Sequence, residues 1–305
     1  MKSKIVYMGT PDYAKVILES LLQEKDFKVT LVLTQPDKPV GRKKILTPPP
    51  VKKVALKHNL EVIQPETLKD KYIIEEIKSK NPDFIVVAAY GQILPEEILK
   101  IAPCINLHAS LLPKYRGASP VQEAILNQDK FTGVTSMMMA KRLDAGDILS
   151  FSYLKLSDKI RVDELMQKLS KMAGELIVNT LKNYANLNPI PQLDANASYC
   201  KKIKRADGII DFGLSATEVY TKFRAFYGWP GIFFENGLKL LEIELEDENL
   251  KEEAGKILSI QKEAIIVAFS KGSIRIEKLQ PKGKKAMSAK AYLVGRGLKV
   301  GDKIF

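Results

Sequence analysis

Short apolar runs alternate with amphipathic stretches over the first part of the chain. Strand-like runs occupy 5–8, 29–33, 84–89 and 105–107, and the apolar residues of 13–22 fall at helical spacing. Buried runs that alternate with amphipathic helices are typical of a parallel sheet wrapped by helices. The turn at 9–12 follows the first run but lacks the glycine pattern of dinucleotide-binding folds. We therefore predict an α/β domain with a Rossmann-like parallel sheet.

The second part of the chain has a different pattern. A long amphipathic helix is expected from about Val162 to Tyr184, and a stretch with two prolines follows it at 186–191. Short β-rich segments come next, at 232–234, 238–245, 256–259, 264–269 and 273–279. They predict a small antiparallel barrel or sandwich. The predicted organisation is a first domain at 1–187, a linker at 188–205 and a second domain at 206–305.

Composition narrows the class of protein. The chain has 305 residues, of which 45% are hydrophobic and 28% charged, as in ordinary globular proteins. Its two cysteines, Cys104 and Cys200, exclude a disulfide framework, and no cluster has the spacing of metal ligands, so we expect no metal. No apolar run reaches the roughly 20 residues of a membrane span. We expect a cytoplasmic monomer without membrane contact.

The charge distribution is the most informative feature of the composition. Lys and Arg number 48 against 36 Asp and Glu, which leaves a formal net charge of +12. Residues 38–57 contain seven basic side chains and no acidic one, and residues 278–290 contain five basic side chains and no acidic one. Such clusters are typical of proteins that bind nucleic acid, although a solvated basic surface accounts for them equally well.

Candidate chemistry gathers after the run at 105–107. Side chains alternate along a strand, so Asn106 and His108 are expected on one face at its carboxyl end, where open α/β sheets bind ligands. An amide beside an imidazole there offers an oxyanion donor next to a proton-transfer group. A pair of hydrogen-bonded polar residues at a strand end would look the same, and spacing alone does not decide. A carboxylate from the turn at 143–147, such as Asp144, would hold the imidazole in a useful protonation state.

Several motifs in order carry a resemblance to a known family. INLHASLLPKYRG, with LDAGD downstream, resembles the formyltransferases that use 10-formyltetrahydrofolate. MGTPDYA, QPDKPVGRKK, PDFIVVAAYGQILP, TGVT, RAFYGWPG and LQPKGKKAMSA together are similar to the methionyl-tRNA formyltransferases among them, almost from end to end. The resemblance implies a Rossmann-like formyltransferase domain followed by a small β-barrel domain resembling an OB-fold.

The resemblance also implies roles for particular residues. The family's catalytic residues fall on Asn106, His108 and Asp144. Its folate-contacting residues fall on Ser110, Leu111, Leu112 and Pro113. Its basic loop for the tRNA acceptor end falls on roughly 37–50, where Arg42 is the matched arginine, with Lys38, Lys43 and Lys44 beside it. Near the predicted domain junction, the candidate tRNA-binding residues are Lys201, Lys202, Lys204 and Arg205.

The chain departs from the family pattern in places. Ala140-Lys141-Arg142 stands where an acidic residue is common, Glu123 where an aromatic residue is usual, and Tyr227-Gly228 where Asn-Pro is common. None of these positions coincides with the three implied catalytic residues.

The expected function is transfer of a formyl group from 10-formyltetrahydrofolate, as cosubstrate, to methionine on initiator methionyl-tRNA. A first alternative is a formyltransferase for a small amine, such as a purine precursor or an amino-sugar nucleotide, although the basic segments argue against it. A second alternative is a non-catalytic RNA-binding protein, which would leave INLHASLLP and LDAGD unexplained.

Overall fold

The computed structural model describes residues 2–41 and 43–305, and these residues form two compact units. The first unit comprises 1–121, 130–156 and 165–201, and the second comprises 122–129, 157–164 and 202–305. The predicted domain boundaries at 187 and 205 remain predictions, because this division takes two internal segments into the second unit.

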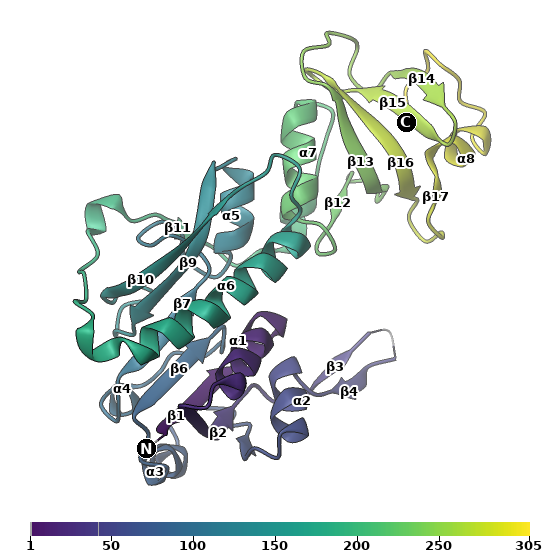
Figure 1. Cartoon of the computed structure of the whole chain (residues 1–305). Coiled ribbons are helices and arrows are strands. Elements are labelled where there is room, and N and C mark those ends of the chain that lie inside the picture. The colour runs from purple at the N-terminus through teal and green to yellow at the C-terminus, as the bar shows by residue number, and fades with distance from the viewer. Residues whose placement is uncertain (1, 42) are drawn as a thin grey trace. The chain divides into compact units, whose positions relative to one another are not determined.

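A seven-stranded sheet is the centre of the first unit (Figure 1). Its strands, in spatial order, are β10 (Ile148–Lys155), β9 (Phe131–Met138), β7 (Cys104–His108), β6 (Phe84–Ala88), β1 (Ser3–Gly9), β2 (Phe27–Leu33) and β5 (Val62–Ile63). The strands from β7 to β5 are parallel, as predicted. The sheet is not parallel throughout, because β9 pairs with β7 and β10 with β9 in antiparallel fashion. The sequence pattern did not reveal these two strands.

Helices cover both faces of this sheet. Successive side chains of each strand point to opposite faces, so each strand packs against both helical layers. Val6 and Met8 of β1 belong to a buried cluster that includes residues of the helices on one face, α3 (Lys71–Ser79) and α4 (Glu96–Leu99). Tyr7, between them in sequence, donates its hydroxyl proton to the carbonyl of Ala14 in α1 (Asp12–Gln23) on the other face.

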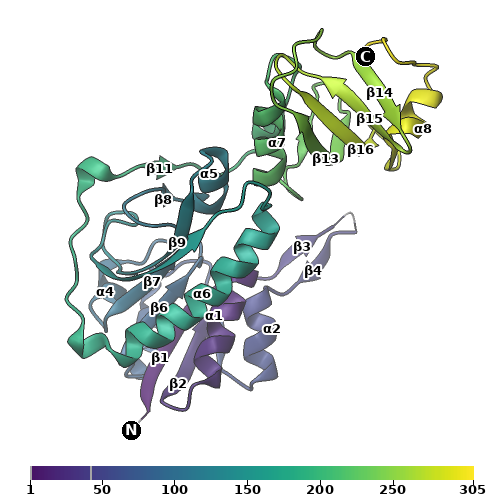
Figure 2. The ribbon, with the colours of Figure 1, turned by 45° about the horizontal axis from the view of Figure 1, so that its top comes forward.

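Two further helices complete the layer that contains α1. They are α2 (Pro50–Lys57), which packs against α1, and the long α6 (Val162–Lys182), which crosses the same face (Figure 2). A Cβ atom on Gly174 of α6 would lie 2.1 Å from the Ser20 hydroxyl of α1, so these helices approach where only glycine fits. The helices predicted at 13–22 and 162–184 are thus confirmed.

The segment expected as a basic loop forms a β-hairpin instead. Its strands are β3 (Lys38–Val40) and β4 (Ile45–Thr47), which pair in antiparallel fashion. Pro50 begins α2, because a proline fits the first turn of a helix, where its missing N–H has no intrahelical partner anyway.

The second unit contains an antiparallel sheet, which confirms the predicted β-rich segments. Its order is β12 (Ile232–Phe233), β13 (Lys239–Asp247), β16 (Ser273–Gln280), β15 (Ala264–Ala268) and β14 (Ile257–Gln261), and β17 (Met287–Ser288) also pairs with β16. Among the described residues no ladder joins the edge strands β12 and β14, as in a partly open OB-type barrel. Two helices accompany the sheet, α7 (Ala216–Ala225) and α8 (Ala289–Val294).

The remaining short elements lie in the sequence around the borders between segments of the two units. They are β8 (Arg116–Gly117), α5 (Pro120–Leu126), β11 (Tyr199–Cys200) and the 3-10 turns η1 (Tyr184–Asn186), η2 (Asp194–Asn196) and η3 (Arg205–Gly208).

Candidate active site

The structure brings His108 and Asp144 together, although they are 36 residues apart in the sequence. His108 ends β7, is buried at 6% exposure, and its Nδ1 lies 3.8 Å from Oδ2 of Asp144. That separation is too long for a direct hydrogen bond between the two atoms, although they remain close enough to interact electrostatically. Asn106 lies two residues earlier in β7 and is half-buried, so strand alternation gives it the same face of the sheet.

A backbone carbonyl fixes the tautomer of His108. Its Nε2 lies 2.8 Å from the carbonyl oxygen of Tyr115, which can only accept a hydrogen bond. Nε2 therefore carries the hydrogen, and in the neutral imidazole the free lone pair is on Nδ1. The ring nitrogen of His108 that is free to accept a proton is thus the one that lies nearer Asp144.

The turn that carries Asp144 has an unusual backbone. Asp144 has φ of 48°, in the left-handed region that costs a residue with a side chain about 1–2 kcal/mol. A Cβ atom on Gly146 would lie 1.9 Å from the carbonyl oxygen of Met138, so only glycine fits there. A residue persists in such a conformation only where its surroundings hold it, and the neighbours of this turn are therefore part of the site.

One of these neighbours is β8, which follows the predicted folate loop. The amide N–H of Gly117 donates to Oδ2 of Asp144 at 2.9 Å. Gly117 has φ of 123° and pairs with Cys200 of β11, so that a Cβ atom would lie 2.2 Å from the Cys200 carbonyl oxygen. No pattern in the sequence indicated that the predicted linker contributes a strand here.

Lys141 and Arg142, which depart from the family pattern, anchor the same turn at two points. Lys141 pairs with Glu96 of α4 at 2.6 Å, and Arg142 pairs with Asp194 at 2.7 Å. The hydrogen bonds of Lys141 and Lys100 lower the pKa of Glu96 to about 2. Those of Arg142 and Arg116 hold the pKa of Asp194 below its ordinary value. The positive charges of Lys141 and Arg142 are thus each paired with a carboxylate of the same unit.

The predicted folate loop is ordered by hydrogen bonds to the neighbouring strand. The Thr135 hydroxyl of β9 donates to the carbonyl of Ser110 at 2.6 Å and accepts from the Leu112 N–H at 3.0 Å. The Ser110 hydroxyl donates to the carbonyl of Lys114 at 2.6 Å. Leu112 is buried in a small cluster with Met137 and Ile148, whereas Leu111 and Pro113 are half-buried. The loop therefore lies directly after His108 in a fixed conformation.

The order of the strands reveals a further part of the site that sequence reasoning missed. The chain runs outward from β1 through β2 to β5 and returns to β6 on the other side of β1, so a switch point lies between β1 and β6. Ligands of such sheets bind at the carboxyl ends of the strands there. Thr10, after β1, donates its hydroxyl proton to the Tyr90 carbonyl after β6 at 3.0 Å.

Two buried polar atoms near that switch point are candidates for ligand contacts. Burial raises the pKa of Tyr90 to about 12. Within the described part of the chain, its hydroxyl and Nε2 of Gln35 have no hydrogen-bond partner. The sequence signal that could have found them is the strand order, which the apolar runs alone do not give.

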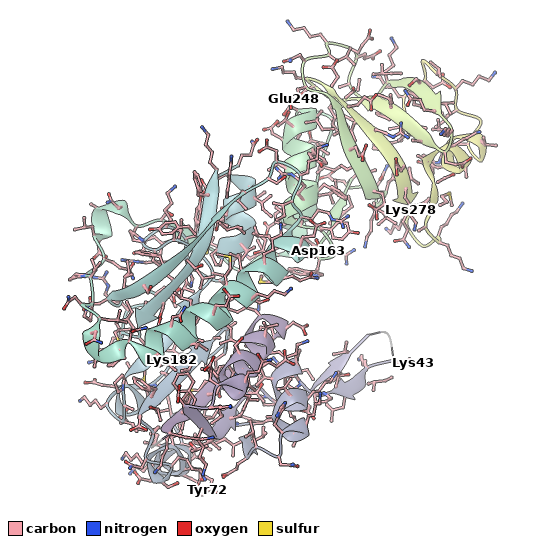
Figure 3. The ribbon with its side chains drawn as sticks, viewed as in Figure 1. Lys43, Tyr72, Asp163, Lys182, Glu248 and Lys278 are labelled. Carbon is pink, nitrogen blue, oxygen red and sulfur yellow. The ribbon has the colours of Figure 1, made fainter. Side chains whose placement is uncertain are left out.

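The predicted tRNA-binding residues occupy several places. Lys38 lies in β3, while Lys43 and Lys44 lie in the turn of the β3–β4 hairpin, from which Lys43 projects (Figure 3). Arg42 lies outside the described residues. Lys201 ends the first unit, and the second unit resumes with Lys202, followed by Lys204 and Arg205. Lys202 and Arg205 are exposed, and Lys204 caps η3 through its N–H to Asp207.

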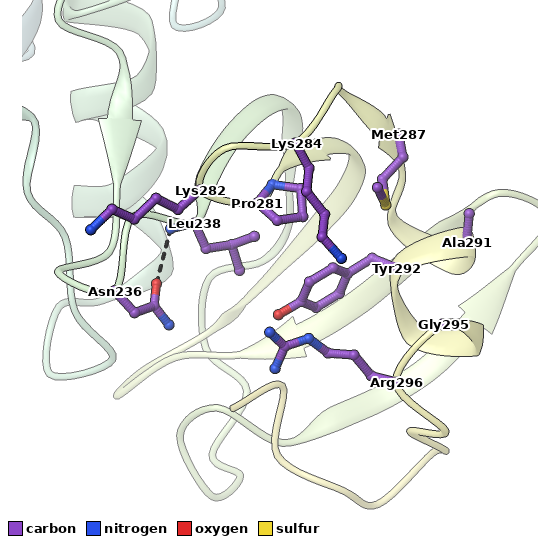
Figure 4. Close-up of a pocket in the computed structure, with 10 residues that line it drawn as sticks. All are labelled: Asn236, Leu238, Pro281, Lys282, Lys284, Met287, Ala291, Tyr292, Gly295 and Arg296. Atoms are coloured by element: carbon purple, nitrogen blue, oxygen red, sulfur yellow. Dashed lines mark hydrogen bonds between the residues drawn. The ribbon is translucent and has the colours of Figure 1, made fainter.

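The second unit has a basic pocket of its own, of about 340 Å³ (Figure 4). Lys284 and Arg296 lie beside the ring of Tyr292, which is 4.9 Å from the Arg296 guanidinium, and Lys282 also lines the pocket. Basic side chains around an aromatic ring are a combination that nucleic-acid-binding surfaces use.

Metal-ligand clusters and membrane-crossing helices are both absent from the described residues. Among them, no group of three or more His, Cys, Asp or Glu side chains could hold a metal ion. In the same part of the chain, no helix combines the length and the apolar character required to cross a membrane.

Comparisons with known proteins cover the whole chain. A family described as formyl transferase matches residues 1–181, and a formyl transferase C-terminal domain matches residues 202–297. A methionyl-tRNA formyltransferase of Sulfurovum sp. is 54% identical over 304 residues, which covers 100% of both chains. One from Nitratiruptor sp. is also 54% identical, over 99% of this chain and 100% of that protein.

Among solved structures, HypX from Aquifex aeolicus in complex with tetrahydrofolic acid has a similar fold. Its TM-score is 0.68 at 17% identity, over 98% of this chain and 49% of that chain. The fold, the paired domain matches and the end-to-end identity agree, and the chain belongs to the methionyl-tRNA formyltransferase family.

Proposed function

We propose that this protein transfers the formyl group of 10-formyltetrahydrofolate to the α-amino group of methionine on initiator methionyl-tRNA. The full-length identity to methionyl-tRNA formyltransferases carries the proposal. HypX, a protein of similar fold, was crystallised with tetrahydrofolic acid, which supports folate as the cosubstrate. We also propose that the protein acts in the cytoplasm and that it is a monomer. Light scattering would test the monomeric state.

The first chemical task is to stabilise charge on the formyl oxygen. The folate supplies a formyl carbon bound to N10, and the neutral α-amine of methionine attacks that carbon. The carboxamide of Asn106, on the face of β7 that carries His108, is assigned as the donor to the developing oxyanion. In other enzymes, one such donor lowers the activation barrier by about 2.7–4 kcal/mol.

The second task is to move a proton. Nε2 of His108 is held by the Tyr115 carbonyl, so Nδ1 accepts the proton that the amine loses as its bond to the formyl carbon forms. The protonated ring is stabilised by Oδ2 of Asp144, 3.8 Å away. The same proton then passes to N10 as the bond between N10 and the formyl carbon breaks. Atoms and charge balance, and neither a metal nor a covalent enzyme intermediate takes part.

Substrate choice is assigned to the basic surfaces. The hairpin lysines 38, 43 and 44, together with Arg42, would contact the acceptor end of tRNA, and lysines 201, 202 and 204 with Arg205 would contact its phosphates. Several neutralised phosphates make binding fall steeply with salt.

The test measures single-turnover formylation of initiator methionyl-tRNA with saturating 10-formyltetrahydrofolate. Wild-type protein should formylate the initiator, and elongator methionyl-tRNA serves as the comparison. The variants His108→Ala and Asp144→Asn should each lose at least about 100-fold in rate, as general acid–base groups contribute 10²–10⁴-fold. Preference for a small amine such as an amino-sugar nucleotide would replace this function with the alternative, and the absence of any formyl transfer would leave only RNA binding.

A further inference from the structure

The segment that leads out of the first unit is bonded to that unit at both ends. Ile190 exchanges backbone hydrogen bonds with Ile148 of β10, at 2.8 and 2.9 Å. Eight residues later, the Arg116 N–H donates to the Ser198 carbonyl at 2.8 Å, and β11 then pairs with β8. The stretch 190–200, which we call the strap, is therefore docked on the unit that holds His108 and Asp144.

Gln192, near the start of the strap, contacts the turn that carries Asp144. Its Nε2 donates to the carbonyl oxygens of Asp144, at 3.0 Å, and of Gly146, at 2.7 Å. The first carbonyl belongs to Asp144, which adopts the left-handed conformation, and the second lies two residues further along the turn. A double donor at this place restrains the peptide groups that follow the Asp144 Cα, and so helps to hold that conformation.

The orientation of the Gln192 amide is fixed by Arg116. Its Oε1 accepts from Nε of Arg116 at 3.0 Å and from Nη2 at 2.8 Å. A guanidinium can only donate and a carbonyl can only accept, so a flipped amide would lose all of these bonds. Gln192 thereby uses both its donor hydrogens and both its acceptor sites.

Arg116 is itself immobile. Its side chain is 0% exposed, and its Nη1 donates to Oδ1 of Asp194, another strap residue, at 2.9 Å. Tyr199 of β11 adds its hydroxyl oxygen as a further acceptor, 3.3 Å from Nη1. The strap therefore closes a chain of contacts from Asp194 and Tyr199, through Arg116 and Gln192, to the backbone of Asp144.

We propose that Gln192 is a positioning residue for the formyl-transfer reaction, and that it acts by holding the Asp144 turn so that Oδ2 stays aimed at His108. The inference rests on the proposed function. It gives one side chain of the strap, which in sequence is only a linker, a role at the active site. A displacement of about 1 Å at a reacting group can cost about 100-fold in rate, so loss of Gln192 should lower kcat and leave both KM values nearly unchanged.

Two substitutions separate positioning from simple stability. Gln192→Ala removes both sets of bonds. Gln192→Glu keeps two acceptor oxygens for Arg116 but replaces the donor to the turn with an oxygen that repels the two carbonyls. The strap should stay docked in Gln192→Glu, with Tm near that of wild type, while kcat falls by about 100-fold. Leu193→Ala, at an adjacent side chain that is 69% exposed, is the matched control and should retain wild-type kcat.

The deciding measurement is a double-mutant cycle with Asp144→Asn in single-turnover formylation. If Gln192 acts through the Asp144 carboxylate, Gln192→Ala should slow the wild type but have little further effect in Asp144→Asn. Equal losses in both backgrounds, an unchanged kcat in Gln192→Glu, or a loss confined to KM would each overturn the inference. A wild-type protein that does not formylate methionyl-tRNA would instead overturn the proposed function beneath it.

Discussion

Replacing Gly117 with alanine tests the docking of β11 on β8. Gly117 has φ of 123°, and a Cβ atom there would lie 2.2 Å from the backbone oxygen of Cys200, about 1 Å inside van der Waals contact. The oxygen belongs to backbone and cannot rotate away, so β11 must move off β8.

The magnitude follows from these terms. A side chain at positive φ costs about 1–2 kcal/mol. Displacing β11 weakens the hydrogen bonds from the Arg116 N–H to Ser198 and from the Ala118 N–H to Cys200, each worth about 1 kcal/mol. We expect a loss of about 3–4 kcal/mol in the free energy of unfolding. At roughly 2–4 °C per kcal/mol for a unit of this size, Tm should fall by about 6–16 °C.

Calorimetry on the full chain measures this effect, with Gly41→Ala as the control. Gly41 also has positive φ, 71°, but nothing lies within 4 Å of its added Cβ, so only the backbone cost of about 1–2 kcal/mol applies. Formylation well below Tm should also slow in Gly117→Ala, because β8 loses the strand that braces the Gly117 N–H against Asp144. A Tm equal to that of Gly41→Ala, together with a wild-type rate, would refute the reasoning.

Three further predictions concern charge and burial. Replacing both Lys43 and Lys44 with alanine should raise KM for tRNA and flatten its salt dependence while KM for folate stays constant; equal changes in both KM values would assign the hairpin elsewhere. The pKa of Glu96 is lowered to about 2, so its ion pair with Lys141 contributes above pH about 4.5 and is lost as the pH falls toward 2; the difference in Tm between wild type and Glu96→Gln should shrink over that range, and a constant difference would contradict the pair. Burial raises the pKa of Cys104 to about 12, so its alkylation at pH 8, located by mass spectrometry, should occur only after unfolding, and rapid labelling of native protein would contradict its burial.

The apolar runs predicted most of the architecture because the central strands are buried on both faces. Most of β1 and all of β6 read as continuous apolar segments, and β2 and β7 are mostly apolar, which is the pattern of parallel strands between two helical layers. The strands β9 and β10 escaped prediction because Ser, Thr and Gly interrupt the apolar residues of β9, and because β10, an edge strand, is largely half-exposed. Their antiparallel direction is set by tertiary pairing, which no local pattern encodes.

The candidate site was predictable only in part. Alternation along 104–108 put Asn106 and His108 on one face, and the turn chemistry of 143–147 marked Asp144, but their approach depends on the fold. The tautomer of His108 is set by Tyr115, and the left-handed turn is held by Gln192, through contacts that cross 7 and 48 positions of chain. The proline-bounded stretch 189–191 predicts a linker. The side chains that dock the strap, such as Gln192 and Asp194, are polar residues that no local pattern distinguishes from a solvated loop.

The docked strap has a practical consequence for anyone who divides this protein into parts. A fragment cut at the end of α6 would keep the whole central sheet and would be expected to fold, yet it would lack the residues that immobilise its own aspartate. A fragment that extends through Cys200 would keep them. Modules exchanged between related enzymes should therefore be joined after β11, because the proposed positioning of Asp144 needs the strap as well as the central sheet.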